Sequence, residues 1–228
     1  MISETRTHHR YSLSLKPFAQ FKLRAHAVEF TLFLFTTWLT LAAGAATWTW
    51  SGSGGVNANW NNSANWGSLG IPANGDTVVF PGGAANVLNT NNIASLTLNQ
   101  IRFTGSAGGY DIRGLAFTLT NSIFATNTAG ANIIENNITL AMTNVLVAVS
   151  NGVSLTLAGT NSGAFGITKT GLGTLIYNSP GDNTYTGTTL VIDGLLQLDV
   201  DGFHAFGGPL VVGDNSTLHN PTDRKSVV

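Results

Sequence analysis

Acidic residues near the end of the chain are the first candidates for chemistry. Asp199 and Asp201 stand two positions apart, and Asp182, Asp193 and His204 are close to them in the sequence. A glycoside hydrolase needs two carboxyl groups across the scissile bond, one as acid and the other as base or nucleophile. A polysaccharide-acting β-helix enzyme is therefore one hypothesis. The spacing does not require it, because scattered acids also close turns.

The segment Asp199–Gly202 also begins like a calcium-binding loop. Such a loop needs Gly at its sixth position and a bidentate Glu at its twelfth. His204 and Leu210 stand at these positions instead. We therefore expect a turn here, and no metal or cofactor.

The remaining inventory for catalysis is short. The chain has no cysteine, which excludes disulfides, thiolate nucleophiles and thiolate metal sites. We find no P-loop, G-x-S-x-G or H-E-x-x-H motif. These observations predict that the protein is not an enzyme.

Four tryptophans crowd the region that follows the first 45 residues: Trp48, Trp50, Trp60 and Trp66. Their flat rings could stack on sugars, which makes a glycan-binding module a second alternative. They could also form a hydrophobic cap over the first coil of a repetitive fold, which needs its open end covered. We favour the cap.

The segments that must position these residues are short and alternate between apolar and polar residues, the pattern of β-strands. The predicted strands are 77–80, 95–103, 115–120, 138–149, 153–157, 174–177, 188–191, 195–200 and 210–212. Gly, Asn and Asp predict turns between them, at 105–109, 126–132 and 179–183.

Several predicted strands have similar sequences, as in SLTLNQIRFTG, AFTLTN, NITLAMTN and VSLTLAGTN. Such internal similarity is typical of solenoids, in which each coil buries its face against the next. We therefore predict an all-β, right-handed parallel β-helix. An antiparallel β-sandwich is the structural alternative.

The first 45 residues predict a secretory signal peptide. A basic, polar stretch precedes the apolar run 30–41, and small residues follow. Ala43, Ala45 and Ala46 mark the predicted cleavage region, with the mature chain beginning near Ala46 or Thr47. A signal anchor that stays in the membrane is the alternative, because 28–46 approaches the length of a bilayer span.

The net negative charge of the region after the predicted signal peptide argues against nucleic acid as a partner. Residues 46–222 contain three basic and eight acidic residues. Nucleic-acid binding requires clustered Lys and Arg.

The segment 168–198 carries a family resemblance. It reads TKTGLGTLIYNSPGDNTYTGTTLVIDGLLQL and resembles the autotransporter-associated β-strand repeat, with T-K-x-G-x-G-T-L, N-T-Y-T-G-x-T-x-V and x-G-x-L-x-L parts. The positions that carry the match are Gly171, Gly173, Thr174, Leu175, Asn183, Thr184, Tyr185, Thr186, Gly187, Gly194, Leu196 and Leu198. From the residues, we expect Asn183–Gly187 to form a turn with positive φ at Gly187, and Tyr185 to pack against the coil.

This resemblance implies the β-helical passenger of an autotransporter or a related large surface protein. We expect a structural or adhesive segment, secreted or on the outer surface of a Gram-negative-type bacterium. Its implied partners are the export machinery and surface glycans or other cells, with only transient membrane passage. Since one full motif copy is present, we expect an N-terminal fragment of a larger protein.

The predicted organisation is a signal peptide at 1–45, a Trp-rich cap at 46–80 and a β-helical repeat region at 81–222. The last six residues, 223–228, are interpreted as a truncation or artefact tail, because two bases appear there abruptly.

Overall fold

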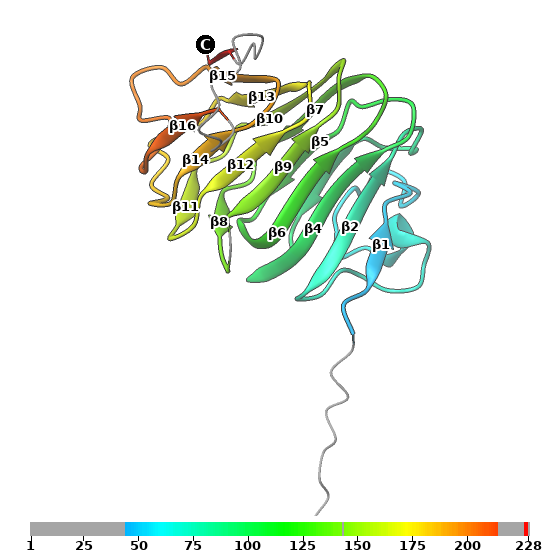
Figure 1. Ribbon diagram of the computed structural model, residues 1–228. Coiled ribbons are helices and arrows are strands. Elements are labelled where there is room, and N and C mark those ends of the chain that lie inside the picture. Colours follow the sequence, from blue (N-terminus) through cyan, green and yellow to red (C-terminus); the bar gives the residue numbers. More distant parts are fainter. Residues whose placement is uncertain (1–43, 143, 214–225, 228) are drawn as a thin grey trace, which may run out of the picture. The chain divides into compact units, whose positions relative to one another are not determined.

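The computed structural model describes residues 44–142 and 144–213, and the backbone of residues 226–227. This part of the chain is a β-solenoid of two sheets whose strands lie side by side in chain order (Figure 1). Every strand pair recorded there is parallel. The predicted parallel β-helix is confirmed. The antiparallel sandwich is wrong, because neighbouring strands come from successive coils and run in the same direction.

The first sheet has ten strands. Eight follow one another along it: β1 (Thr47–Thr49), β2 (Asp76–Pro81), β4 (Leu96–Thr104), β6 (Phe117–Ala125), β9 (Val145–Val149), β12 (Ile167–Thr170), β14 (Thr189–Val191) and β16 (Leu210–Val212). The long strand β6 pairs with both β9 and the short β8 (Ile138–Leu140), and β8 pairs with β11 (Asn161–Gly163).

The second sheet has seven strands. They are β3 (Leu88–Asn91), β5 (Asp111–Gly114), β7 (Gly130–Ile134), β10 (Val153–Leu157), β13 (Thr174–Tyr177), β15 (Leu195–Leu198) and β17 (Ser226–Val227). A short 3₁₀ helix, η1 (Ser63–Trp66), lies between β1 and β2.

One coil is about 22 residues long, and equivalent residues of successive coils lie side by side. The side chains of Asn121 and Asn99, 22 positions apart, are hydrogen-bonded between β6 and β4 at 3.2 Å. Alternate residues of each strand face the interior, and one interior row runs through Val78, Ile101, Ile123, Val147, Lys169 and Val191. All six are buried. Stacked aliphatic rows of this kind form the core.

The strand predictions were accurate where the alternation is regular. The predicted segments at β10, β13 and β16 have the observed bounds, whereas the segment 138–149 is divided into β8 and β9. Strands β3, β5, β7, β11 and β12 were missed. The turn predicted at 126–132 is partly wrong, because β7 begins at Gly130.

The predicted domain boundary at residues 80 and 81 does not separate two folds. Strand β2 pairs with β1 on one side and with β4 on the other. The Trp-rich region therefore joins the same sheet as the repeat region. In the predicted tail, the backbone of Ser226–Val227 pairs with β15, and the rest lies outside the described residues.

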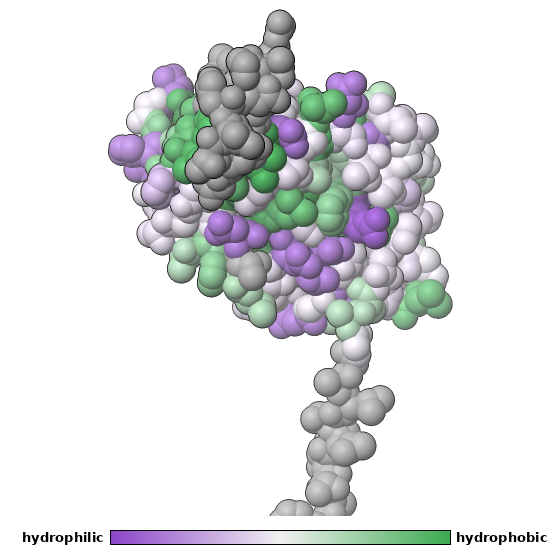
Figure 2. Space-filling view, viewed as in Figure 1, coloured by the Kyte–Doolittle hydropathy of each residue, from purple (hydrophilic) through white to green (hydrophobic). Residues whose placement is uncertain are grey.

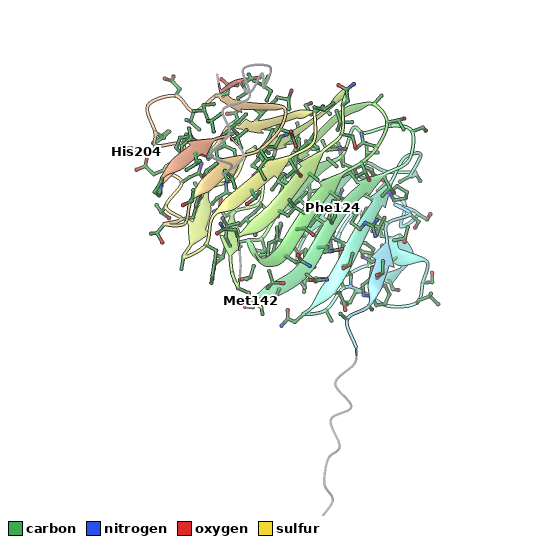
Figure 3. The ribbon with its side chains drawn as sticks, viewed as in Figure 1. Phe124, Met142 and His204 are labelled. Atoms are coloured by element: carbon green, nitrogen blue, oxygen red, sulfur yellow. The ribbon has the colours of Figure 1, made fainter. Side chains whose placement is uncertain are left out.

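The outer side of the solenoid mixes apolar and polar residues, as Figure 2 shows for one face. Phe124 of β6 is half-buried there, and the guanidinium carbon of Arg102 lies 5.9 Å from its ring centroid (Figure 3). Met142 is exposed in the segment after β8 and has a φ of 81°. Figure 2 shows that apolar residues gather near the middle of this face, with polar residues around them.

Candidate functional site

Lys169 occupies a position in β12 where the neighbouring coils have valine. Val147 of β9 lies on one side of it and Val191 of β14 on the other. The lysine side chain is fully buried. A buried ammonium group requires partners, because an unpaired charge away from water carries a large free-energy penalty.

The ammonium group of Lys169 donates to three carbonyl oxygens. Thr170 O, at 3.0 Å, is at the end of β12, and Gly171 O, at 2.6 Å, is in the turn that follows. The third, Asp193 O at 3.0 Å, belongs to the equivalent turn of the next coil. Burial lowers the pKa of Lys169 to about 8, and the charge of Asp193 acts in the opposite direction. This side chain joins two successive turns from inside.

Three motif glycines let these turns approach one another. Gly171 and Gly194 have φ of 76° and 72°, a region that other residues rarely adopt. A Cβ at Gly171 would lie 2.4 Å from Val149 O, and one at Gly173 would lie 2.1 Å from Ser150 O. A Cβ at Gly194 would lie 2.4 Å from Gly171 O. A side chain at any of these three positions would clash with the backbone of the preceding coil, which explains why each position is a glycine.

The apolar motif residues serve the second sheet. Leu175 and Leu196 lie side by side and are fully buried. Leu198 is half-buried beside Tyr177, and Thr174 begins β13 with a partly exposed side chain. These positions complete the core of the coil.

Asn183 forms a second polar link between coils. Its Oδ1 accepts hydrogen bonds from the backbone N–H of Asn161 at 2.7 Å and from the Asn161 side-chain amide at 3.0 Å. Its Nδ2 donates to Ala205 O at 3.0 Å. Asn161 and Ala205 are each 22 positions away, in the preceding and following coils. One buried amide therefore connects three coils.

The NTYTG segment is extended and does not form the predicted turn. The backbone N–H groups of Thr184 and Thr186 donate to carbonyl oxygens of β11. The prediction of positive φ at Gly187 is wrong, since this glycine is not among those with positive φ. A Cβ at Gly187 would lie 2.2 Å from the nitrogen of Gly166. Close contact between coils explains this glycine too.

Tyr185 lies inside the coil. Its hydroxyl is 3.2 Å from the hydroxyl of Tyr177 and 2.5 Å from Oγ1 of Thr189, and all three residues are buried. Burial is the main cause that raises the pKa of both tyrosines. The three hydroxyl groups satisfy one another within the core.

Three of the four tryptophans are inside the first coils. Trp50, Trp60 and Trp66 are at most 3% exposed and pack around Phe80. Their indole N–H groups all have acceptors within the chain. A sugar ring cannot reach these faces, so the stacking hypothesis is reduced to the fourth tryptophan, Trp48.

Trp48 is half-buried beside a pocket of about 380 Å³. The pocket is lined by Ala46, Thr47, Trp48, Thr49, Trp66, Gly67 and Leu69. The indole N–H of Trp48 donates to Oδ2 of Asp76 at 2.7 Å. This ring is therefore fixed in place at the edge of the first sheet.

The acidic residues considered for catalysis lie on exposed segments. Asp199 and Asp201 follow β15, and Asp193 lies in the turn after β14. Asp182 accepts a hydrogen bond from the backbone N–H of His204 at 2.7 Å, and its Oδ1 lies 3.0 Å from the imidazole Nδ1 (Figure 3). These bonds, the backbone one foremost, lower the pKa of Asp182. This pair connects two coils at the surface.

The predicted signal peptide lies outside the described residues up to and including Ala43. Ala45 is exposed, and Ala46 is half-buried at the start of the fold. The backbone N–H of Ala46 donates to Oδ1 of Asp76 at 2.6 Å, and Ala46 O accepts from Thr77 N at 2.8 Å. The predicted cleavage region therefore adjoins the first strand.

Sequence reasoning missed the buried roles of Asp76, Asn161 and Lys169. Each has at least one partner that is 22 or more positions away in the sequence, and no local pattern reveals such a partner. The one available signal is alignment at the coil spacing, where Lys169 falls in a row of aliphatic residues.

Among the residues that the structure describes, no group of three or more His, Cys, Asp or Glu could hold a metal ion. In the same part of the chain, no helix has the length and hydropathy required to cross a membrane. No protein-family model, curated protein or solved structure matches the chain.

Proposed function

We propose that the chain is a structural and adhesive passenger segment of an exported bacterial surface protein. Its solenoid would support transport and display outside the cell. The observation that carries the proposal is the use of the motif residues: Lys169, Asn183 and Gly194 all contact the backbone of a neighbouring coil. The buried polar groups of the motif hold neighbouring coils together, which favours a structural role over a catalytic one.

The resemblance of residues 168–198 to the autotransporter-associated β-strand repeat supports the same proposal. In that family the repeat belongs to β-helical passengers. We propose the same location for this chain, secreted or on the outer surface of a Gram-negative-type bacterium, reached through the predicted signal peptide. The partners would be the export machinery and surface glycans or other cells.

The physics of the solenoid suits such a role. Each coil contacts only its neighbours, so the fold can form coil by coil. A chain that crosses an envelope unfolded could therefore fold progressively after passage. The chain has no cysteine, so no disulfide has to form for this folding.

Export is tested by expressing the full chain in a Gram-negative-type host. A variant with L34R and L39R, which places two charges in the apolar run, is the control. We expect the unaltered chain to leave the cytoplasm and the variant to stay there. Retention of the unaltered chain, or export of both, would contradict the proposal.

The enzyme alternative is tested with the same exported protein and a panel of polysaccharides. The scaffold proposal predicts no release of reducing or unsaturated sugars. Release that is lost in D199N or D201N would overturn it, because these carboxylates would then take part in the reaction.

Glycan binding is a second candidate, favoured by the pocket beside Trp48. A soluble oligosaccharide that stacks there should quench tryptophan emission in the unaltered chain and not in W48F. Trp60 is fully buried, so W60F should keep the quenching if it folds. No quenching by any member of the panel would remove this candidate.

A further inference from the structure

Asp76, at the start of β2, holds the beginning of the described chain. Its side chain belongs to a residue that is only 5% exposed. Oδ1 accepts from Ala46 N at 2.6 Å, and Oδ2 accepts from Trp48 Nε1 at 2.7 Å and from Ala73 N at 2.9 Å. Three N–H groups, two from the first strand segment and one from the loop before β2, therefore converge on one carboxylate.

No ion pair in the described structure gives Asp76 a positive partner. The pairs found there join Arg113 to Asp111 and Glu135, and His204 to Asp182. A buried carboxylate normally has a positive partner or is fully hydrogen-bonded. Of the three donors, only the nitrogen of Ala46 could become a cation by cleavage of the chain.

The sequence before this nitrogen has the form that a signal-peptide-cleaving protease requires. Ala43, Gly44 and Ala45 form a small-x-small triplet. Gly44 and Ala45 are exposed, whereas Ala46 is half-buried and its carbonyl accepts from Thr77 N. Ala46, one residue before β1, is thus already bonded to β2 through both its N–H and its carbonyl group.

We propose that the chain is cleaved between Ala45 and Ala46 and that the new α-ammonium group of Ala46 pairs with the carboxylate of Asp76. Water adds OH to the carbonyl carbon of Ala45 and hydrogen to the nitrogen of Ala46, which then takes up a proton from solvent. The resulting ion pair, between a buried carboxylate and the half-buried Ala46, holds β1 on β2. This inference rests on the proposed export of the chain.

The geometry favours cleavage of the Ala45–Ala46 peptide bond over cleavage of the next bond, Ala46–Thr47. Gly44-Ala45-Ala46 is also a small-x-small triplet, and cleavage after it would leave Thr47 as the first residue. That product would lose the bond to Asp76 and the bond from Thr77 N, both of which Ala46 makes. The structure therefore favours Ala46 as the first residue of the mature protein.

The test is to express the full chain in an exporting Gram-negative-type host and to identify the first residue of the exported protein by mass spectrometry of its N-terminal peptide. We expect Ala46. A mature chain that begins at Thr47 or elsewhere would overturn this inference and leave export intact. An uncleaved chain kept in the cytoplasm would overturn export and, with it, this inference.

The ion pair itself is tested by labelling the α-amino group of the mature protein with acetic anhydride. Pairing should slow labelling about tenfold in the folded protein relative to the urea-unfolded protein, since a factor of ten corresponds to a modest free energy of pairing. D76N should abolish this protection, and D199N, at an exposed carboxylate, should keep it. Equal rates in folded and unfolded wild-type protein would overturn the pairing, whether or not D76N folds.

Discussion

The ammonium group of Lys169 donates a hydrogen bond to the carbonyl oxygen of Asp193, 24 positions further along the chain, at 3.0 Å. The contact joins the turn after β12 to the turn after β14. It also explains why a lysine can stand between two valines in the interior row of the first sheet. The repeat motif therefore encodes contacts between coils.

Lys169 should make stability depend on pH in the alkaline range. Its pKa is about 8 in the folded state, below the unfolded value of about 10.4. Between these values the unfolded chain binds more protons, so the free energy of unfolding rises with pH and the contribution is lost as pH falls through 8. We expect the difference in the free energy of unfolding between the wild-type protein and K169M to rise by about 2 kcal/mol between pH 8 and 10, measured by urea denaturation.

Above about pH 10 the sign reverses because of the buried tyrosines. Burial raises the pKa values of Tyr110, Tyr177 and Tyr185, so above that pH the folded state retains protons that the unfolded chain loses. Stability should therefore pass through a maximum near pH 10. A wild-type curve that matches K169M from pH 8 to 10 would contradict the buried position of the ammonium group.

Gly194 tests how closely the backbones of successive coils approach one another, and Gly202 serves as its control. Both have positive φ, 72° and 75°, but a Cβ at Gly194 would lie 2.4 Å from Gly171 O, whereas nothing lies within 4 Å of one at Gly202. G202A should lower the free energy of unfolding by about 1 kcal/mol through backbone strain alone. G194A should lower it by at least about 2 kcal/mol more, because backbone atoms must move. Equal losses in thermal melts would show that the coils do not approach this closely.

Asn183 should contribute far more to stability than an exposed asparagine. Its removal leaves the N–H of Asn161 and the carbonyl of Ala205 without a partner in the interior. We expect N183A to lower the free energy of unfolding by about 2–4 kcal/mol. The control N151A, at an exposed turn, should change it by less than about 0.5 kcal/mol. Similar values for the two variants would contradict the three-coil link.

The buried aromatic residues of the first coils should respond unequally to truncation. Trp60 is fully buried and its indole donates to Asn89 Oδ1 at 2.7 Å, whereas Trp48 is half-buried. W60A should lower the free energy of unfolding by about 3–5 kcal/mol and W48A by less. Differential scanning calorimetry of both variants measures this order, and the reverse order would contradict the burial pattern.

Regular alternation made several strands predictable from sequence, and buried polar residues made others unpredictable. The segment 153–157 alternates apolar and polar residues without interruption and was predicted with its observed bounds. Strand β12 contains Lys169 at an interior position, which breaks the apolar alternation. One acceptor of that lysine, Asp193 O, lies in the next coil, and only stacking brings it within hydrogen-bond distance. For the same reason Asp76 could not be recognised as the partner of the residue at position 46.

The motif glycines show the same limit. Gly187 was expected to need positive φ, because glycine in a short segment usually indicates a turn. The structure gives a different reason for this glycine: a Cβ here would lie 2.2 Å from the nitrogen of Gly166 in the preceding coil. This reason depends on how the coils stack, which the local sequence does not reveal.

The most direct test of the stacked-coil account is disulfide cross-linking in this cysteine-free chain. Thr168 and Leu190 are register partners that flank Lys169 and Val191 on β12 and β14. Neighbouring strands lie about 4.8 Å apart, a separation that a disulfide can span. T168C with L190C should form a disulfide under mild oxidation, whereas T168C with I192C, shifted by two positions, should remain largely reduced. Equal or preferential cross-linking of the shifted pair would contradict the register that brings Lys169 to Asp193.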